Sequence, residues 1–379
     1  MPAIEYIKRK FGSTYLVWLK KSNLYVQLEE PAWFVFKKTV KRFKTETIAS
    51  ECVDRYGLTS IESLKYVTEI RSGIEKMNQA SDVFINKKYP DGLASYTYEP
   101  FSVYCYKFGE TIAEFSFETR NFEYYIHPLL NHLETAQLST KKAVFELFAF
   151  YDKIAFRLNG EIKGLWTYDE THLVKGLIFM NLINVIFHKN DDFWLMTVHA
   201  SAITNGQKTI LFPAEPGSGK TTIAALLQDR GYKLVSDDFV PIDRNTYAYP
   251  FPIAMSVKQG AVEVLTSIFP DLEQKPLNFI TPEKGVRYVS LEKSEDIDKQ
   301  PFPVKEFVFI KYDQTVDFEI IKLDPIVGAK LLLGQAWVAA TEGTPEILFD
   351  CLAKWSFFQL TYSNNTKAID AITKLFEHD

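Results

Sequence analysis

A glycine-rich run in the middle of the chain has the spacing of a phosphate-binding loop. Ala214-Glu-Pro-Gly-Ser-Gly-Lys220-Thr221 fits the P-loop (Walker A) pattern, with alanine in place of the first glycine. Gly217 and Gly219 allow a tight turn whose backbone N–H groups point inward, toward phosphate oxygens. Lys220 can bridge the β- and γ-phosphates, and the Thr221 hydroxyl can hold Mg²⁺. The predicted ATP contacts are Ala214, Pro216, Gly217, Ser218, Gly219, Lys220, Thr221 and, at the α-phosphate, Thr222.

Two adjacent acids follow the predicted loop. Asp237 and Asp238 come 17 and 18 residues after Lys220, directly after the strand-like segment 233–236. A carboxylate at the end of a neighbouring strand is where a P-loop enzyme holds its metal. The other acid can accept a proton from an attacking hydroxyl, since adjacent strand residues face opposite ways. The candidate metal ligands are therefore Thr221, Asp237 and Asp238, with the two aspartate roles unassigned and a solvated acidic turn as the alternative.

Three further residues could reach the same place. His199 lies 21 residues before Lys220, at the end of the strand-like segment 194–198. Strand order can bring it beside the phosphates, although a histidine in an apolar run is more often structural. Lys258 and Arg287 are candidate extra cations at the phosphates, for which a solvated surface role is the alternative.

Composition excludes several classes of protein. The 379 residues carry 43 Lys and Arg against 48 Asp and Glu, a net charge of −5 that disfavours nucleic-acid or membrane-surface binding. Three widely spaced cysteines suggest reduced thiols rather than disulfides or zinc. The first residues lack the apolar core of a signal peptide, and the apolar segment 174–187 is too short to span a bilayer. We therefore expect a cytoplasmic protein with no membrane partner.

The chain divides into a small first domain (1–80), a linker (81–92) and a long second domain (93–379). Loop-forming residues at 78–92 mark the boundary. In the first domain we expect a hairpin and then three short helices, which together make a winged-helix-like module. The expected elements are strands at 15–20 and 24–28, a helix from Pro31, a helix capped by Thr45 that ends near Gly57, and a helix capped by Ser60 whose apolar face includes Ile61, Leu64, Val67, Ile70, Ile74 and Met77.

The second domain mixes strand and helix patterns, which predicts the α/β class for this domain. Taken over the whole chain, the expected class is α+β. Aromatic residues concentrate in 18–43, 96–125 and 145–194, where we expect most to be core and one exposed cluster could help form a peptide groove. The expected strands are 102–106, 112–117, 123–126, a hairpin of 156–158 with 164–166, 194–198, 209–212 and 233–236; the expected helices are 139–150, 172–188 and one after Lys220.

The motif order resembles the bacterial HPr kinase/phosphorylase family. VHASA, AEPGSGKTT and LVSDDFVPID stand in the family's order and at similar spacing. This resemblance implies a P-loop fold related to phosphoenolpyruvate carboxykinase and phosphoryl transfer from ATP to a serine hydroxyl. It makes Asp237 or Asp238 the general base, His199 a catalytic-site neighbour and Lys258 the counterpart of a family arginine. The family's Glu-x-Arg-Gly signature is absent, which favours relatives from peptide-modification gene clusters over kinases of HPr itself.

The first domain resembles the PqqD-like domains that recognise leader peptides. The resemblance lies in the strands, the three helices and the Leu28-Glu-Glu-Pro-Ala-Trp33 junction. It implies that a leader peptide binds as an added strand beside the last helix, a mode that an exposed sheet edge permits. The alternatives are a winged helix used for dimerisation and a DNA-reading winged helix that uses the lysines and arginine of 37–44.

The sequence thus predicts an ATP- and Mg²⁺-dependent kinase that phosphorylates a hydroxyl, serine by preference, of a ribosomally made precursor peptide captured by its leader. Two alternatives stay open: a nucleotide-binding adaptor without transfer, and a kinase of a small-molecule or protein hydroxyl. The oligomeric state stays open too.

Overall fold

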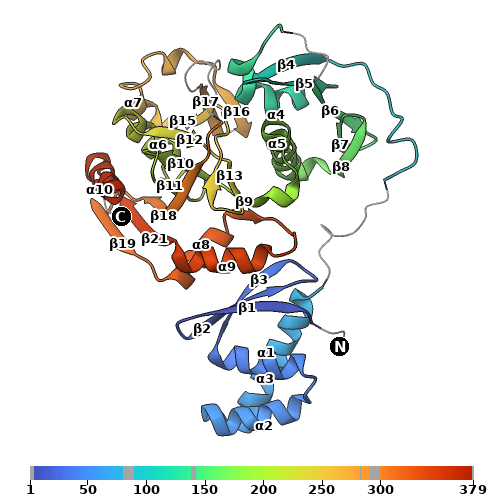
Figure 1. Ribbon diagram of the computed structural model, residues 1–379, viewed down its shortest axis with the longest axis vertical. Coiled ribbons are helices and arrows are strands. Elements are labelled where there is room, and N and C mark those ends of the chain that lie inside the picture. The colour runs from blue at the N-terminus through green and yellow to red at the C-terminus, as the bar shows by residue number, and fades with distance from the viewer. Residues whose placement is uncertain (1–3, 80–88, 138–141, 282–283, 291–298, 378–379) are drawn as a thin grey trace. The chain divides into compact units, whose positions relative to one another are not determined.

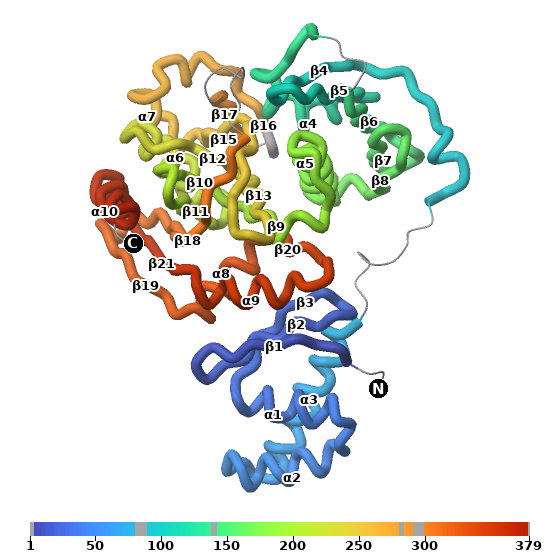
Figure 2. The backbone as a smooth tube through the Cα atoms, viewed as in Figure 1, coloured from blue at the N-terminus to red at the C-terminus, as the bar shows by residue number. Residues whose placement is uncertain are grey.

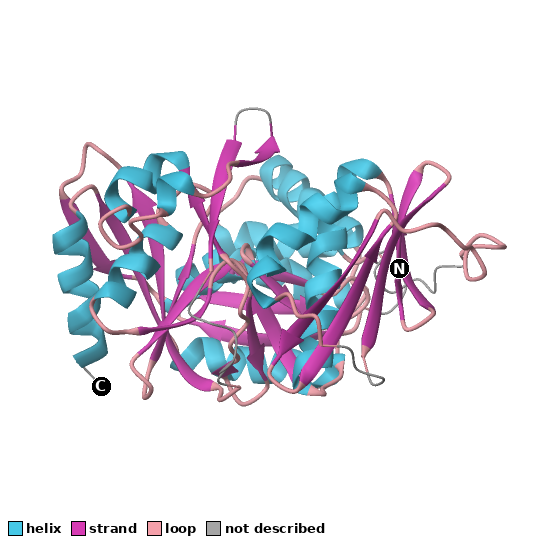
Figure 3. Cartoon of the chain, turned by 90° about the horizontal axis from the view of Figure 1, so that it is seen from above, coloured by secondary structure: helices cyan, strands magenta, loops and turns pink. Residues whose placement is uncertain are grey.

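The computed structural model describes residues 4–79, 89–137, 142–281, 284–290 and 299–377 (Figure 1). It contains both helices and strands, arranged in several sheets, which agrees with the expected α/β class (Figure 3). The chain forms two compact units. Unit 1 is Met1–Lys87 with Leu323–Gly334 and Ala340–Trp355, and unit 2 is the remainder. The predicted linker, 81–92, lies largely outside the described residues.

Unit 1 contains a three-stranded antiparallel sheet in the order β1-β2-β3. The expected hairpin is present as β2 and β3, and the sequence reading missed β1. Because three consecutive charged residues, Lys8, Arg9 and Lys10, occupy β1, its apolar pattern is weak, and pairing with β2 makes it a strand. The elements are β1 (Tyr6–Phe11), β2 (Thr14–Leu19), β3 (Leu24–Glu29), α1 (Glu30–Val40), α2 (Thr45–Tyr56) and α3 (Ser60–Met77).

Helix caps in unit 1 correct two predictions by one residue each. The cap of α3 is Thr59, whose side chain and that of Glu62 form a reciprocal capping box, so the Ser60 cap was wrong. The residue before α2 is Lys44, which gives no side-chain cap, and α2 ends as expected at Gly57 with φ 68°. The apolar face expected for α3 is also partly wrong, because Ile61 is 83% exposed.

The sheet of unit 1 is covered on both faces. On one face, Val17 and Leu19 belong to a hydrophobic core that they share with buried residues of α1 and α3. On the other face, the Tyr25 ring lies edge-on to Phe349 at 6.0 Å between centroids. Phe349 belongs to α9 (Thr344–Lys354), which follows α8 (Pro325–Leu333). Two segments that the sequence assigned to the second domain thus complete the first unit (Figure 2).

Unit 2 begins with a five-stranded sheet in the order β4-β5-β6-β7-β8. The helix expected at 139–150 is wrong: its described part is the strand β6, which pairs with β5 and β7. The strand expected at 123–126 is also wrong, since it lies in α4, capped by Thr119. The elements are β4 (Ser102–Phe108), β5 (Thr111–Phe117), α4 (Arg120–Leu130), β6 (Ala143–Phe150), β7 (Lys153–Leu158), β8 (Glu161–Trp166) and α5 (Thr171–Phe187).

Helix α5 lies in the largest core of unit 2. By length and apolar composition, Tyr168–Phe187 is the one helix among the described residues that could cross a membrane. Val174, Ile178, Leu182 and Ile186 are buried against residues of β5 and β7. This packing is that of a core helix, as the sequence reading predicted.

The second large sheet of unit 2 positions the candidate site. Its order is β12-β10-β11-β18-β14-β13-β9-β20, with β21 and β19 continuing from β18. A smaller sheet has the order β15-β17-β16. The strands and helices are β9 (Trp194–Val198), β10 (Ala200–Thr204), β11 (Thr209–Pro213), α6 (Lys220–Asp229), β12 (Lys233–Ser236), β13 (Val240–Asp243), β14 (Tyr247–Ala248), β15 (Met255–Lys258), α7 (Val262–Leu265), β16 (Asn278–Thr281), β17 (Lys284–Val289), β18 (Phe302–Tyr312), β19 (Phe318–Lys322), β20 (Ala336–Val338), β21 (Ser356–Tyr362) and α10 (Asn365–Glu377).

The direction of β10 decides where the motifs meet. It lies between β11 and β12 and is antiparallel to both, with Ala200 opposite Pro213 and Ala202 opposite Ser236. The start of β10 therefore shares one sheet edge with the ends of β11 and β12. His199 directly precedes the start of β10, the P-loop follows the end of β11, and the aspartate pair follows the end of β12. These three groups therefore come together at that edge.

Replacing Phe349 with alanine tests whether α9 is part of unit 1. Phe349 is 2% exposed, and loss of such a ring costs about 3–5 kcal/mol of stability. We expect hydrogen exchange, measured by mass spectrometry, to accelerate in β1–β3 and to stay unchanged in β9–β13. The control is Val327→Ala on α8, whose side chain is exposed. Faster exchange in β9–β13 instead would contradict the division of the chain.

Candidate functional site

The glycine-rich segment has the strand–loop–helix form that the sequence predicts. It joins β11 to α6, which begins at Lys220. Gly217 and Gly219 have φ values of 97° and 101°, a backbone region that favours glycine. A Cβ on Gly219 would lie 2.5 Å from the Tyr362 hydroxyl, so space also requires glycine there. Pro216 and Gly217 are exposed, Ser218, Thr221 and Thr222 are half-buried, and Ala214 is buried.

The Lys220 side chain is held inside the loop. Its ammonium donates one hydrogen bond to the Ala214 carbonyl and another to Nε2 of His199, at 2.9 Å. Lys220 is only 7% exposed, and burial lowers the pKa of its ammonium although Asp238 and Asp237 act against that shift. His199 is therefore brought to the P-loop lysine, as the sequence reading considered.

Asp237 is buried among donors. Its carboxylate accepts hydrogen bonds from the Ser201 hydroxyl and from the Thr221 hydroxyl, the latter at 3.1 Å. The Ser256 amide donates to the same carboxylate at 3.4 Å. Burial, together with the neighbouring Asp238 charge, raises the pKa of Asp237 to about 6. The Asp237 carboxylate therefore faces Thr221, the threonine that follows the P-loop lysine.

Asp238 faces the other way, among cationic and imidazole groups. Its backbone has φ 73°, uncommon for a residue with a side chain. Nδ1 of His199 lies 3.1 Å from its carboxylate. Burial raises its pKa, but His199 and the charges of Lys175, Lys220 and Lys258 prevail, so the pKa stays below its usual range. The two adjacent acids have opposite environments.

His199 connects Asp238 to Lys220. Burial lowers the pKa of the imidazole, so the ring is neutral near pH 7. A neutral ring has one donor and one acceptor nitrogen. Because the Lys220 ammonium must donate to Nε2, we assign the proton to Nδ1, which points at Asp238. The imidazole therefore orients both charged groups at once.

The two extra cations predicted from the sequence are placed differently. Lys258 ends β15, and its Nζ lies 4.0 Å from where a Cβ on Gly217 would be. It therefore approaches the P-loop. Arg287 lies on β17, where its guanidinium donates to the Gln259 side chain at 2.7 Å.

Several residues of the site escaped the sequence reading. Ser201 lies within the quoted VHASA motif, two residues after His199, and strand alternation could have indicated it. Lys175 lies on α5, and no local sequence pattern marks it as a residue of the site. The Gln335 carbonyl accepts from the His199 amide at 2.7 Å, and its side chain donates to Glu215 of the P-loop at 2.6 Å. Only the pairing of β20 with β9 places Gln335 there.

The donor set fits a magnesium ion held partly by phosphates. Among the described residues, no group of three or more His, Cys, Asp or Glu side chains could hold a metal alone. Mg²⁺ in such sites takes one or two protein oxygens and completes its shell with phosphate oxygens and water. The Thr221 hydroxyl and the Asp237 carboxylate, which is buried and has a raised pKa, could supply those oxygens.

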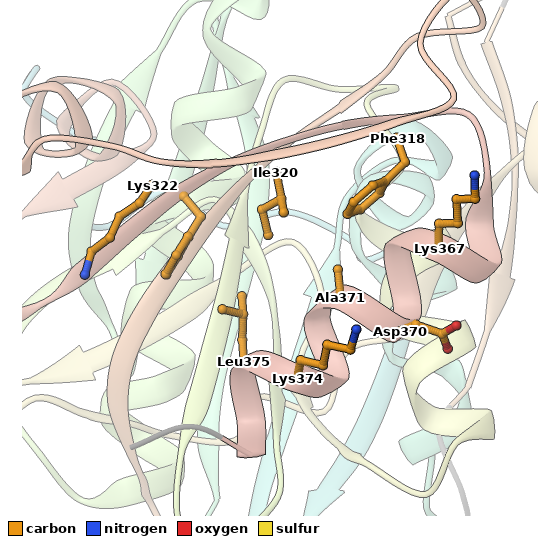
Figure 4. Close-up of a pocket in the computed structure, with 9 residues that line it drawn as sticks. Phe318, Ile320, Lys322, Lys367, Asp370, Ala371, Lys374 and Leu375 are labelled. Atoms are coloured by element: carbon orange, nitrogen blue, oxygen red, sulfur yellow. The ribbon is translucent and has the colours of Figure 1, made fainter.

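Two larger cavities lie away from these residues. One, about 530 Å³, lies between β19, β21 and α10, where Phe318, Ile320 and Leu375 face its interior (Figure 4). Another, about 590 Å³, lies within unit 1 between β2, β3 and α8. Neither is lined by a residue of the P-loop, His199 or the aspartate pair.

No protein-family model matches the chain, and no curated protein matches it in sequence.

The pKa of Asp237 leads to a pH test with the nucleotide-free protein. Its folded-state pKa of about 6 exceeds the ordinary value of 3.8. Its contribution to stability is therefore present below about pH 4 and lost as the pH rises through 6, by about 3 kcal/mol at most. We expect urea unfolding of the wild type to show this loss between pH 4.5 and 7.5. In Asp237→Asn the loss should be smaller, because the side chain cannot ionise. An equal pH slope in both proteins would contradict the assignment.

Proposed function

We propose that the chain is an ATP- and Mg²⁺-dependent kinase that phosphorylates a hydroxyl, serine by preference, of a ribosomally made precursor peptide. The observation that carries the proposal is the shared sheet edge where the P-loop, His199 and the aspartate pair meet. We further propose that unit 2 has the P-loop fold of HPr kinase type and that unit 1 is the winged-helix-like module. A cytoplasmic location is part of the proposal, and the free thiols of Cys52, Cys105 and Cys351 agree with it.

The loop residues bind and orient the triphosphate. The backbone N–H groups around Gly217 and Gly219 and the N-terminus of α6 face phosphate oxygens. Lys220 exchanges its bonds to the Ala214 carbonyl and His199 for the β- and γ-phosphates, and Lys258 adds a second positive charge near Gly217. Together they offset the negative charge of the phosphates in the transition state.

Thr221 and Asp237 would hold the magnesium ion. A bound ion would neutralise part of the negative charge of the phosphates. Ser201 and the Ser256 amide fix the Asp237 carboxylate beside Thr221.

Asp238 is the group that we assign as general base. The serine oxygen forms a bond to the γ-phosphorus, the bond from the γ-phosphorus to the bridging oxygen breaks, and ADP leaves with that electron pair. The serine proton passes to the Asp238 carboxylate. A carboxylate with a low pKa is a weak base, which suffices where the proton moves late in a loose transition state. His199 holds this carboxylate in position.

Unit 1 provides the edge that peptide capture needs. Among the described residues, β3 pairs with β2 alone, so its other side can accept an added strand. The cavity beside it is lined by apolar and charged side chains, which can select among peptides. They are Leu16, Tyr25, Gln27, Glu29, Ile326, Lys330 and Leu333, with Gly334. Capture of the leader there raises the local concentration of the acceptor segment.

A phosphorylation assay tests the kinase proposal. The full chain, ATP and Mg²⁺ are incubated with the precursor peptide encoded beside its gene, and the peptide is weighed by mass spectrometry. We expect the mass of one phosphate, and about 10²–10⁴-fold lower kcat for Asp238→Asn because the proton acceptor is lost. Lys220→Ala should abolish both transfer and nucleotide binding.

Asp237→Asn is the matched variant for that assay. It should raise the Mg²⁺ concentration needed for half-maximal rate, a change that Asp238→Asn should not produce. Exposed Asp271→Asn serves as the neutral control. Bound ATP without any phosphate on the peptide would refute the kinase and leave the adaptor, and equal effects of Asp237→Asn and Asp238→Asn would refute the division of roles.

Hydrogen exchange with the leader peptide tests capture by unit 1. We expect slower exchange in the β3 amides when the leader is added, because a new strand satisfies the free edge. The β1 amides are the internal control, since that strand lies at the opposite edge of the sheet. Unchanged exchange in β3 at a saturating leader concentration would contradict this mode of binding.

A further inference from the structure

Exposed aromatic side chains gather on α4 and the elements next to it. Tyr124 and Tyr125 on α4 are 40% and 44% exposed, Tyr168 just before α5 is 50% exposed, and Phe279 on β16 is 53% exposed. We call these four residues the α4 aromatic surface. Exposed groups of large apolar side chains mark binding sites more often than chance. Phosphate binding and metal binding use none of them.

Contacts tie the elements that carry these residues to α4. The Phe279 amide donates a hydrogen bond to the Tyr124 hydroxyl, which ties β16 to α4. On the other side of α4, Phe122 stacks on Tyr168 with ring centroids 6.4 Å apart. Figure 1 shows α4 between β16 and α5. The surface thus runs from the β16–β17 hairpin across α4 to the start of α5.

The same surface approaches the aspartate pair from two directions. Tyr125 and Lys175 line one small cavity between α4 and α5, and the Lys175 charge acts on Asp238. On the side of the hairpin, Tyr288 of β17 stands opposite Ser256 in the strand register, and the Ser256 amide donates a hydrogen bond to the Asp237 carboxylate. Both flanks of the α4 aromatic surface therefore adjoin residues that interact with the aspartate pair.

We propose that the α4 aromatic surface binds the apolar side chains that flank the acceptor hydroxyl in the peptide. This inference rests on the proposed kinase function. An extended peptide advances about 7 Å for each two residues, so the residues that flank a hydroxyl at Asp238 extend toward the elements that carry Tyr125 and Phe279. Aromatic rings provide a large apolar contact area with little loss of side-chain entropy. Residues near the acceptor, and not the leader alone, thus select the substrate.

Peptides with different flanking residues test this inference. Two versions of the precursor peptide carry the same leader and acceptor, with either leucine or glycine on both sides of the acceptor. An apolar group that fills a pocket changes the ratio of kcat/KM values between two substrates by about 10–200-fold. We therefore expect kcat/KM to favour the leucine version by at least about tenfold. Tyr125→Ala combined with Phe279→Ala should reduce this ratio to about threefold or less.

Two controls separate ring contact from general damage. Tyr125→Phe keeps the ring and should keep the wild-type ratio. Tyr151→Ala removes an aromatic side chain that is 87% exposed in the β6–β7 turn and should also keep it. A wild type that transfers phosphate equally to both versions, or a ratio unchanged in the double variant, would overturn the aromatic surface and leave the kinase standing. Absence of transfer from the wild type to either version would overturn both.

Discussion

The insertion of β10 between β11 and β12 is the constraint on which the site depends. Because β10 runs opposite to both neighbours, one sheet edge receives its start and their two ends. Segments separated by up to 39 positions, from His199 to Asp238, meet there. The buried strand residues on all three strands hold this register, since a shift by one residue would turn Ser201 away from Asp237.

Electrostatics gives the two neighbouring aspartates opposite pKa shifts. Asp237 has a raised pKa because it is buried beside another carboxylate, and hydroxyls from β10 and α6 fix it. Asp238 has a lowered pKa because three lysines and a histidine face it. The left-handed backbone at Asp238 separates these environments. Such divergence between adjacent acids is expected where one prepares a cation site and the other handles a proton.

The division of the chain into two units also bears on the proposed recognition of a peptide. The sheet of unit 1 would leave the face of Tyr25 uncovered if the first 79 residues folded alone, and Phe349 of α9 covers it. Between α8 and α9, β20 joins unit 2 and places the Gln335 carbonyl on the His199 amide. A single stretch of chain, 323–355, thus contributes both to the proposed peptide module and to the proposed catalytic edge.

Local chemistry was readable from the sequence, whereas long-range pairing was not. Glycine spacing predicted the tight turn between β11 and α6. The turn at Asn159-Gly160 and the helix end at Gly57 likewise follow from backbone preferences that need no partner. The strand β6 was misjudged as a helix because its apolar spacing fits either period until β5 and β7 pair with it. Lys175, Gln335 and the opposite environments of Asp237 and Asp238 were decided by tertiary structure alone. They depend on which strands and helices become neighbours, and side-chain burial and charge interactions exist only after those neighbours pack.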